Sequence, residues 1–587
     1  MCGILGIYGK VPSSEVRNKL SQRIAHRGPD DAGEWTSESD WLAHVRLAIL
    51  DIVGGHQPFV SEDGRYVLVF NGEIYNYIEL KQQLLAQGHH FSSDGDTEVL
   101  FHLLIEHGPN ALPLLNGMFA FAFLDTVSRS FLCGRDRMGI KPFFYSRVGD
   151  KLYFASELSI LSELACKDQT LSIDREALWH YFSTLYIPSP LTIYREIRSL
   201  RPGHYLLCND DDVHEVRYWT PRFEQRSRKE DDLLDEVQEA IDESVRIHMR
   251  SDVPFGAYLS GGVDSSMVVL AMARQKMSNL RTFNVKVCDD ELNEAVFAAQ
   301  VAQRCNTQHS VINISSIEAS LLQEIVVRCG QPFADSSLLP TFLVSQRISE
   351  KVKVALGGDG PDELFAGYNK YSLAETDRYV PGSVERAFFR VPREVKSLLF
   401  KEAFGRDRED TFDFLLKDLY EKPKTSFDCL RQLDMRFFLE SDVMSKVDLM
   451  SMAHGLEVRT PFIESRIIDI ACALPTRLLC QDGAGKFLLK KLLAREMGDE
   501  FAMRPKVGFM LPIDKWLVDE MRSLMETFLQ DAFIAELGVF SNTGIRKLYR
   551  LYVEGRQGAA VGHAIFAFIV FCIWIKDQRR KGYVSDC

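Results

Sequence analysis

Cys2 is the first residue of this 587-residue chain whose type and position could do chemistry. Removal of Met1 would leave a thiol and a free α-amino group on one residue. An α-amino group has a pKa of about 7.7 to 8.0, so near neutral pH it can take the thiol proton. The resulting thiolate could attack a side-chain amide, form a thioester and release ammonia. A cysteine here is by itself a weak signal, because an incidental terminal residue is the simpler interpretation.

A glycine-rich run, 259–266 (LSGGVDSS), is the second candidate. It follows a strand-like segment, 253–259, and precedes a helical one, 265–275. Exposed N–H groups in such a loop, and the dipole of the following helix, attract phosphate. The run is not a Walker A loop, which requires G-x-x-x-x-G-K-[ST]. The run 483–486 (GAGK) is superficially closer to that pattern, but it lacks the first glycine, so we take it to be unrelated.

The elements that position these residues fall into two parts. From Cys2 to about Tyr205 the chain shows short β-type runs broken by Gly and Asn turns, which predicts a sheet-rich half. Polar stretches then mark a boundary near residue 220. Beyond it, apolar strands alternate with helical segments, as in a parallel sheet covered on both faces, and the chain is mostly helical from about 381. We predict domains at 2–215 and 225–587.

Composition narrows the functional class. The net charge of −13 gives no reason to expect nucleic-acid binding, so a small-molecule substrate is favoured. Twelve cysteines without a C-x-x-C pair, together with a start unlike a signal peptide, favour a reducing cytoplasm. The apolar run 558–575 is nearly long enough to span a membrane. We expect a buried core helix there and no transmembrane segment, with peripheral membrane contact left open.

The N-terminal half resembles the class II, N-terminal-nucleophile glutamine amidotransferases. The segments that carry the resemblance occur in order: Cys2-Gly3-Ile4, 26–30 (HRGPD), Arg46-Leu47, 71–76 (NGEIYN) and 96–98 (DTE). The resemblance implies a sandwich of antiparallel sheets flanked by helices, as in N-terminal-nucleophile hydrolases. It makes Cys2 the nucleophile, with Asn71 and the Gly72 N–H group as an oxyanion hole. It also implies that Arg46 binds the α-carboxylate of glutamine, that Asp96 and Glu73 face its α-ammonium group, and that Asn71 contacts this substrate.

The S-G-G-x-D-S run resembles the pyrophosphate loop of ATP pyrophosphatases, which transfer AMP to an acceptor oxygen and release pyrophosphate. The implied chemistry is adenylation of a carboxylate, because ammonia displaces AMP from an acyl adenylate far more readily than oxide from a free carboxylate. ATP and Mg²⁺ are therefore expected, with Asp264 helping to hold the metal ion.

Taken together, the two halves resemble the asparagine synthetase family over nearly the whole chain, through segments that include 456–462 (LEVRTPF) and 504–509 (RPKVGF). The family implies a doubly wound parallel sheet in the C-terminal half, a sheltered path for ammonia and a common homodimeric state. It makes Lys506 the active-site lysine and Asp359 a carboxylate involved in forming the acyl adenylate. Asp362 becomes a second metal or pyrophosphate ligand. The residues expected to bind ATP are Leu259, Ser260, Gly261, Gly262, Asp264, Ser265, Val285, Gly357 and Gly358.

The run 357–368 (GGDGPDELFAGY) departs from the family's S-G-D-G-G-D-E-L-F-G-G-Y at Gly357, Pro361 and Ala366. Asn293 and Leu449 depart from frequent family residues as well. The acceptor is therefore left open between aspartate and another carboxylate of a cell-envelope or secondary-metabolite pathway. A catalytically silent regulator is a third possibility. A phosphoribosyl-type amidotransferase is set aside, because it would carry no pyrophosphate loop.

Overall fold

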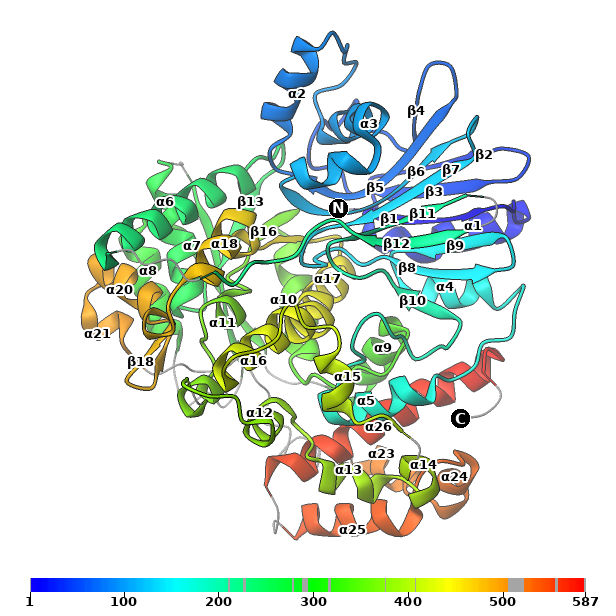
Figure 1. Ribbon diagram of the computed structural model, residues 1–587, viewed down its shortest axis with the longest axis vertical. Coiled ribbons are helices and arrows are strands. Elements are labelled where there is room, and N and C mark those ends of the chain that lie inside the picture. The colour runs from blue at the N-terminus through cyan, green and yellow to red at the C-terminus, as the bar shows by residue number, and fades with distance from the viewer. Residues whose placement is uncertain are drawn as a thin grey trace.

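The computed structural model describes the chain except for residues 1, 210–211, 225–228, 277–278, 288–293, 315–317, 375, 407, 505–521, 555–557 and 585–587. A sandwich of two sheets forms one end of the molecule, and a third sheet with its helices lies beside it (Figure 1). A helical region forms the opposite end. We call the chain up to Arg217 the N-terminal half and the chain from Glu230 the C-terminal half.

Two six-stranded antiparallel sheets build the sandwich. Alternation along the strands explains how it closes, because neighbouring residues point to opposite faces. In β1, Ile4 joins the core between the sheets, whereas Leu5 joins the core beneath the outer helices. In β5, Val69 points into the sandwich and Leu68 points toward α2 and α3. This confirms the antiparallel sandwich that the resemblance implied.

The first sheet has the order β10-β8-β9-β1-β3-β2, with β1 (Cys2–Tyr8), β2 (Asp31–Thr36), β3 (Trp41–Arg46), β8 (Phe144–Val148), β9 (Lys151–Ala155) and β10 (Ile197–Ser199). The second has the order β12-β11-β7-β6-β5-β4, with β4 (Phe59–Val60), β5 (Tyr66–Ile74), β6 (Gly117–Asp125), β7 (Ser130–Arg135), β11 (His204–Cys208) and β12 (Val213–Arg217). The helices of this half are α1 (Ser14–Ile24), α2 (Tyr77–Ala86), α3 (Asp96–His107), α4 (Leu158–Ala165) and α5 (Arg175–Thr184).

The C-terminal half contains a five-stranded parallel sheet of order β15-β14-β13-β16-β17. Its strands are β13 (Phe255–Tyr258), β14 (Arg281–Val287), β15 (Gln308–Ile314), β16 (Val354–Leu356) and β17 (Glu457–Arg459). The strand order reverses between β13 and β16, and ligands of doubly wound sheets bind at such a switch point, beyond the carboxyl ends of the strands. Helices α7 (Val263–Arg274), α8 (Glu294–Arg304) and α10 (Leu338–Ser349) pack against this sheet. The predicted parallel sheet is confirmed.

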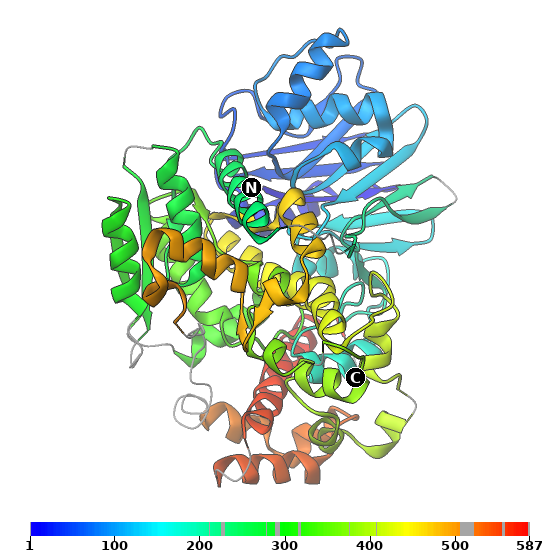
Figure 2. The same ribbon diagram turned by 60° about the vertical axis from the view of Figure 1, so that its left-hand side comes forward.

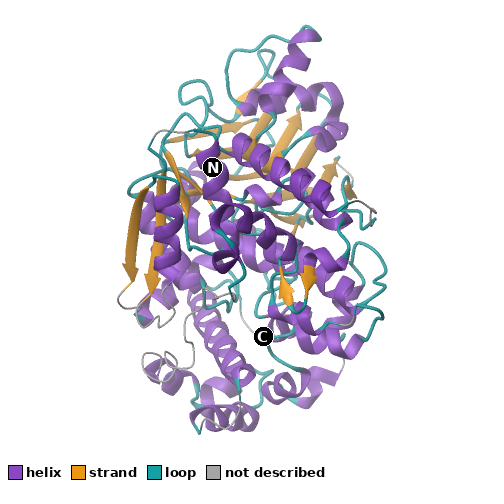
Figure 3. Cartoon of the chain, turned by 90° about the vertical axis from the view of Figure 1, so that its left-hand side faces the viewer, coloured by secondary structure: helices purple, strands orange, loops and turns teal. Residues whose placement is uncertain are grey.

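The remaining helices pack around the parallel sheet and its helices or form the helical region opposite the sandwich (Figures 2 and 3). They are α6 (Glu230–His248), α9 (Ala319–Cys329), α11 (Pro361–Leu364), α12 (Pro381–Phe388), α13 (Arg393–Leu399), α14 (Glu402–Arg406), α15 (Thr411–Leu416), α16 (Ser426–Leu433), a π-helix (Asp434–Met444), α17 (Ser445–Met452), α18 (Ser465–Ala473), α19 (Thr476–Leu479), α20 (Phe487–Met497), α21 (Asp499–Ala502), α23 (Arg522–Phe528), α24 (Asp531–Glu536), α25 (Asn542–Val553) and α26 (Ala559–Lys581). A small hairpin pairs β18 (Cys480–Gln481) with β19 (Ala484–Gly485).

The apolar run at 558–575 is the central helix of this region. Among the described residues, α26 is the one helix long and apolar enough to cross a membrane, and 78% of its most apolar window is buried inside the protein. Helix α5 of the N-terminal half packs on it, since the Tyr181 hydroxyl donates to the Ala567 carbonyl at 2.9 Å. The run is thus a core helix, as expected.

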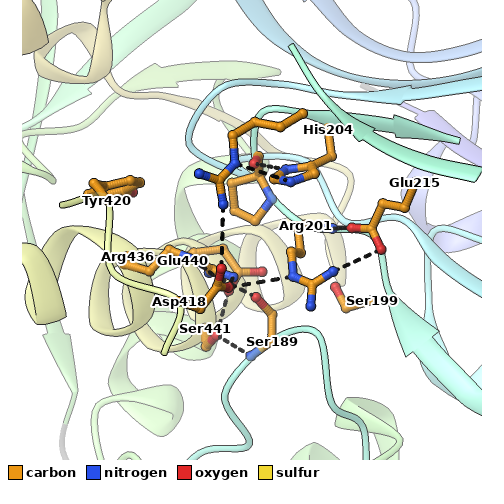
Figure 4. A network of polar contacts seen from close by, with 12 residues as sticks. Ser189, Ser199, Arg201, His204, Glu215, Asp418, Tyr420, Arg436, Glu440 and Ser441 are labelled. Atoms are coloured by element: carbon orange, nitrogen blue, oxygen red, sulfur yellow. Dashed lines mark hydrogen bonds and ion pairs between the residues drawn. The ribbon is translucent and has the colours of Figure 1, made fainter. Parts of the chain in front are cut away.

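A polar network joins the two halves at the surface of the sandwich (Figure 4). Arg436, from the π-helix, donates to Asp418 at 3.1 and 2.5 Å and to the Ser189 hydroxyl at 3.1 Å. Arg201 pairs with Glu215 of β12 at 3.0 Å and lies 3.5 Å from Asp418. These contacts fix the last strand of the sandwich against the π-helix. The segment 189–201 precedes residue 220 in the chain and yet contacts the C-terminal half. The domain boundary near residue 220 therefore stays a prediction.

Candidate active sites

Cys2 lies at the start of β1, opposite Arg46 of β3, and its side chain is buried. Its backbone nitrogen donates to the Asn71 side-chain oxygen at 3.0 Å, and its carbonyl accepts from the Arg27 guanidinium at 3.0 Å. Burial raises the pKa of the Cys2 thiol above its usual value. The Leu47 N–H group and the positive charge of Arg46 lower this pKa, but by less than burial raises it. A base is therefore needed to form the thiolate, which is the role predicted for the α-amino group.

Two hydrogen-bond donors face the region of Cys2 from the end of β5. The N–H groups of Phe70 and Ile74 donate to side chains on the side of β5 away from β6. Because N–H direction alternates along a strand, Gly72 between them presents its N–H group to the same side. The side-chain nitrogen of Asn71 is buried and has no hydrogen-bond partner among the described residues. At Gly72, an added Cβ would lie 2.2 Å from the Met118 carbonyl oxygen, so glycine is required.

Arg46 and Asp96, both predicted to bind glutamine, lie at the edge of the same sheets. The Arg46 guanidinium donates to the carbonyls of Leu50, Asp51 and Ile52 at 3.0, 2.6 and 3.0 Å, so it also shapes the loop after β3. Asp96 begins α3 and accepts the Ile74 N–H at 2.8 Å. Burial raises the pKa of Asp96 to about 6, although that hydrogen bond favours its ionised form.

Glu73 has a partner that sequence reasoning did not identify. Its carboxylate lies 3.2 Å from Arg459 of β17, in the C-terminal half. Arg459 is fully buried, pairs with Glu457 at 2.5 Å, and donates to the carbonyls of His248 and Arg250 at 2.8 and 2.6 Å. Burial alone would raise the pKa of Glu457, but neighbouring positive charge, including Arg459, lowers it to about 2. One guanidinium thus ties strand β5 of the sandwich to the edge of the parallel sheet.

A cavity of about 680 Å³ opens beyond the carboxyl ends of β13, β14 and β16. It brings together nearly all the residues predicted to bind ATP, to hold the metal ion or to take part in forming the acyl adenylate: Leu259, Ser260, Gly262, Asp264, Ser265, Val285, Gly357, Gly358, Asp359 and Asp362. Gly261 lies in the same loop with a φ of 86°, and an added Cβ there would lie 2.6 Å from the Ala298 nitrogen. Its carbonyl accepts from the Arg504 guanidinium.

The phosphate loop is held by its own serines. The hydroxyls of Ser260 and Ser265 lie 3.0 Å apart, and Ser260 also accepts the Gly262 N–H at 3.1 Å. Helix α7 begins at Val263, so the amino end of its dipole faces the cavity. This loop therefore has the form of an anion site, as predicted.

Lys486 is a candidate site residue that sequence reasoning did not identify. Its ammonium group lies 2.5 Å from Asp264 and 2.7 Å from Asp362 inside this cavity. Burial would lower the pKa of Lys486, but the two carboxylates outweigh it and raise the pKa, so the lysine stays protonated. Its sequence signal was the GAGK run that we took to be unrelated. Lys506, the predicted active-site lysine, lies outside the described residues.

Lys446 is a second positively charged residue in this cavity that sequence reasoning did not identify. It lines the same cavity and pairs with Asp335 at 2.5 Å. Lys446 also lowers the pKa of Asp359, whose burial is the larger influence and raises it. Asp359, the carboxylate predicted to take part in forming the acyl adenylate, thus lies near a positive group.

The residues around Lys486 fit a magnesium ion in part. Asp264 and Asp362 already hold one cation, the ammonium group, between them. Within the described ranges no group of three or more His, Cys, Asp or Glu residues could hold a metal ion. Mg²⁺ commonly takes one or two carboxylates and completes its shell with water and substrate phosphates. The two aspartates fit that arrangement.

The departures at 357–366 are accommodated by the backbone. Pro361 begins α11, a first helical position at which proline is favoured. The Gly357 N–H donates to the Arg459 carbonyl at 2.8 Å. Ala366 has a φ of 56°, a left-handed conformation that glycine adopts with less strain. Only the third departure is thus conformationally unfavourable.

The comparisons with known proteins match both halves of the chain. The asparagine synthase family model matches residues 236–575, and the glutamine amidotransferase domain model matches residues 1–219. The chain belongs to the asparagine synthetase family. Asparagine synthetase [glutamine-hydrolyzing] 1 of Bacillus subtilis is 31% identical, covering 100% of this chain and 98% of its own. A putative asparagine synthetase of Mycobacterium tuberculosis is 32% identical, covering 98% of this chain and 97% of its own. Membership of this family makes the protein a glutamine-dependent carbon–nitrogen ligase.

The pKa of Asp96 predicts how glutamine hydrolysis depends on pH. If Asp96 pairs with the substrate's ammonium group, it must be ionised, so kcat/KM for glutamine should fall about tenfold per pH unit below about pH 6. Asp96→Asn should lower kcat/KM by about 10- to 100-fold and remove this inflection. Glutamate release at low glutamine, from pH 5 to 8, measures both. The exposed Asp94→Asn variant is the control, and an unchanged inflection in Asp96→Asn would refute the role.

Proposed function

We propose that this protein converts aspartate to asparagine, with glutamine as the nitrogen donor and ATP as the energy source. In the N-terminal half, Cys2 attacks the glutamine side-chain amide and releases ammonia, and water then hydrolyses the thioester to glutamate. In the C-terminal half, the aspartate side-chain carboxylate attacks the α-phosphorus of ATP and pyrophosphate leaves. Ammonia then attacks the acyl carbon of the adenylate and AMP leaves.

One observation carries the adenylation step: the phosphate loop, Asp359 and the Asp264–Lys486–Asp362 cluster line a single cavity. A nucleotide whose phosphates rest on the loop at α7 would place its α-phosphorus close to Asp359 in that same cavity. Leu259 and Val285 offer apolar contacts for the adenosine. Asp264 and Asp362 would hold Mg²⁺, which neutralises charge on the phosphates when it is bound.

Buried contacts between the halves support a sheltered path for ammonia. Arg27, fully buried, pairs with Asp448 of α17 at 2.9 Å, and Lys141 pairs with the same carboxylate at 3.3 Å. A small cavity of about 40 Å³ lies beside them, lined in part by Ile140, Asp448 and Leu449. Leu449 stands where relatives often carry arginine, so this cavity has an apolar wall. Ammonia that crosses here would be kept from protonation in bulk water.

Aspartate is preferred over another carboxylate because the loop departures leave the acidic residues Asp359 and Asp362 in the cavity. Pro361 fits the start of α11, and Gly357 keeps its backbone hydrogen bond to β17. The retained acidic and basic groups also argue against a silent scaffold. We also propose that the protein is cytoplasmic and forms a homodimer.

The division of labour can be tested at Cys2. Cys2→Ala should abolish glutamine-dependent synthesis and spare synthesis from added ammonium salt, because only the ammonia source is lost. The half-buried Cys166→Ala variant is the matched control and should keep both activities. Amide product is measured with each nitrogen donor. Loss of both activities in a folded Cys2→Ala protein would show that the halves do not divide the reaction.

The acceptor can be tested by pyrophosphate release over a panel of carboxylates, with glutamine, ATP and Mg²⁺ present. Aspartate should give pyrophosphate and asparagine in a ratio near one to one. A site that pairs every polar group of its substrate rejects incomplete analogues by about 10⁴-fold, so the true acceptor should be plain. If aspartate fails and Gly357→Ser with Pro361→Gly restores its turnover, the loop has been changed for another carboxylate. Formation of ADP and phosphate would contradict adenylation.

A further inference from the structure

The ammonium group of Lys486 occupies the space between the two carboxylates that are the candidate magnesium ligands. It lies 2.5 Å from an oxygen of Asp264 and 2.7 Å from an oxygen of Asp362, and only 6% of its side chain is exposed. Each of these distances is that of a direct ion pair. The lysine therefore occupies the gap that a metal ion would need.

The backbone around Lys486 holds it there closely. The residue follows the β18–β19 hairpin, has a φ of 56°, and donates its N–H to the Phe365 carbonyl at 3.1 Å. An added Cβ at Gly367 would lie 2.2 Å from Cε of Lys486 and 2.1 Å from the carboxylate of Asp362. An added Cβ at Gly485 would lie 2.1 Å from the Ala366 carbonyl oxygen. Two glycines thus make room for this lysine.

The charges favour exclusion of free divalent cations. Asp264, Asp362 and Lys486 together carry one net negative charge, and a divalent ion that binds both carboxylates must displace or closely approach the ammonium group. Like charges a few ångströms apart in a half-buried site repel strongly. Mg²⁺ also dehydrates reluctantly, so two carboxylates shared with an ammonium group offer it little.

We infer that Lys486 is a positioning residue that keeps divalent cations out of the empty cavity, so that the metal ion enters together with nucleotide phosphates. This inference rests on the proposed use of ATP. The triphosphate offers the ammonium group a new set of anionic oxygens next to the loop at α7. When Lys486 turns to those oxygens, Asp264 and Asp362 become available to the ion that arrives on the phosphates. Metal and nucleotide binding are thereby coupled through one side chain.

Mn²⁺ binding to the nucleotide-free, full-length protein tests this inference. Free Mn²⁺ is counted by electron paramagnetic resonance in a titration. Lys486→Met should bind Mn²⁺ at least about tenfold more tightly than wild type, because it removes the ammonium group that lies between the two carboxylates. Lys486→Arg keeps the charge and should resemble wild type. Lys490→Met is the matched control, because Lys490 lines the same cavity but is in ion-pair contact with neither of the two described carboxylates.

Further variants keep the test decisive. Asp362→Asn added to Lys486→Met should remove the gained affinity, which assigns it to this pair of carboxylates. Lys486→Gln, which can still donate to both carboxylates, replaces Lys486→Met if the latter does not fold. Equal Mn²⁺ affinity of wild type and the neutral variants would overturn the inference.

A second arm adds a non-hydrolysable ATP analogue. The analogue should strengthen Mn²⁺ binding more in wild type than in Lys486→Met, since only wild type must first release its lysine. An equal gain in both proteins would overturn the coupling. Absence of any gain in either protein, with the nucleotide-free difference intact, would instead count against ATP as the substrate, and so against the proposed function.

Discussion

The buried guanidinium of Arg459 is the interaction on which the arrangement of the two sites depends. It pairs with Glu457 beside it on β17 and with Glu73 on β5, which directly follows the candidate oxyanion-hole residues Asn71 and Gly72. The backbone carbonyl of Arg459 accepts the N–H of Gly357, which lines the candidate ATP-binding cavity. Removal of one partner from such a buried pair commonly costs about 3–5 kcal/mol, because a charge is left without compensation. Neither site can therefore shift far without the other.

The surrounding folds explain why this contact is possible. The antiparallel sandwich brings Cys2 and Asn71 together from β1 and β5, strands of two different sheets. The parallel sheet places β17 at its edge, so that Arg459 can reach out of the C-terminal half. Further buried pairs, such as Arg27 with Asp448 and Arg135 with Glu440, lie along the same interface. The polar network around Asp418 fixes the outer rim.

Sequence reasoning identified the candidate site residues that stand in contiguous segments. The loop at 259–266 and the run at 71–76 were found because each builds its part of a site from consecutive residues. The short β-type runs broken by Gly and Asn turns likewise predicted a sheet-rich half. The apolar run that became α26 was placed correctly in the core, because His563 and several small residues interrupt it.

What escaped prediction depends on contacts between distant residues. Lys486 lies 222 residues after its partner Asp264 in the phosphate loop. The GAGK run that contains it resembles a Walker A loop only superficially, so it was taken to be unrelated. Arg459 belongs to a three-residue strand whose pattern indicates neither its burial nor its partner Glu73. The 11-residue π-helix at Asp434–Met444 has no sequence signature of its own. Such features follow from tertiary packing, which periodicity does not describe.

The central claim is that one sheltered interface carries nitrogen from Cys2 to the activated carboxylate. Its most direct test is synthesis from glutamine labelled with ¹⁵N in the side-chain amide, in the presence of an equal concentration of unlabelled ammonium at a pH near 8. Mass spectrometry of the amide product then gives the origin of its nitrogen. Our account predicts a product that carries ¹⁵N almost throughout, because ammonia passes between the sites without mixing with bulk solvent. A product whose isotopic ratio matches that of free ammonia in solution would contradict it.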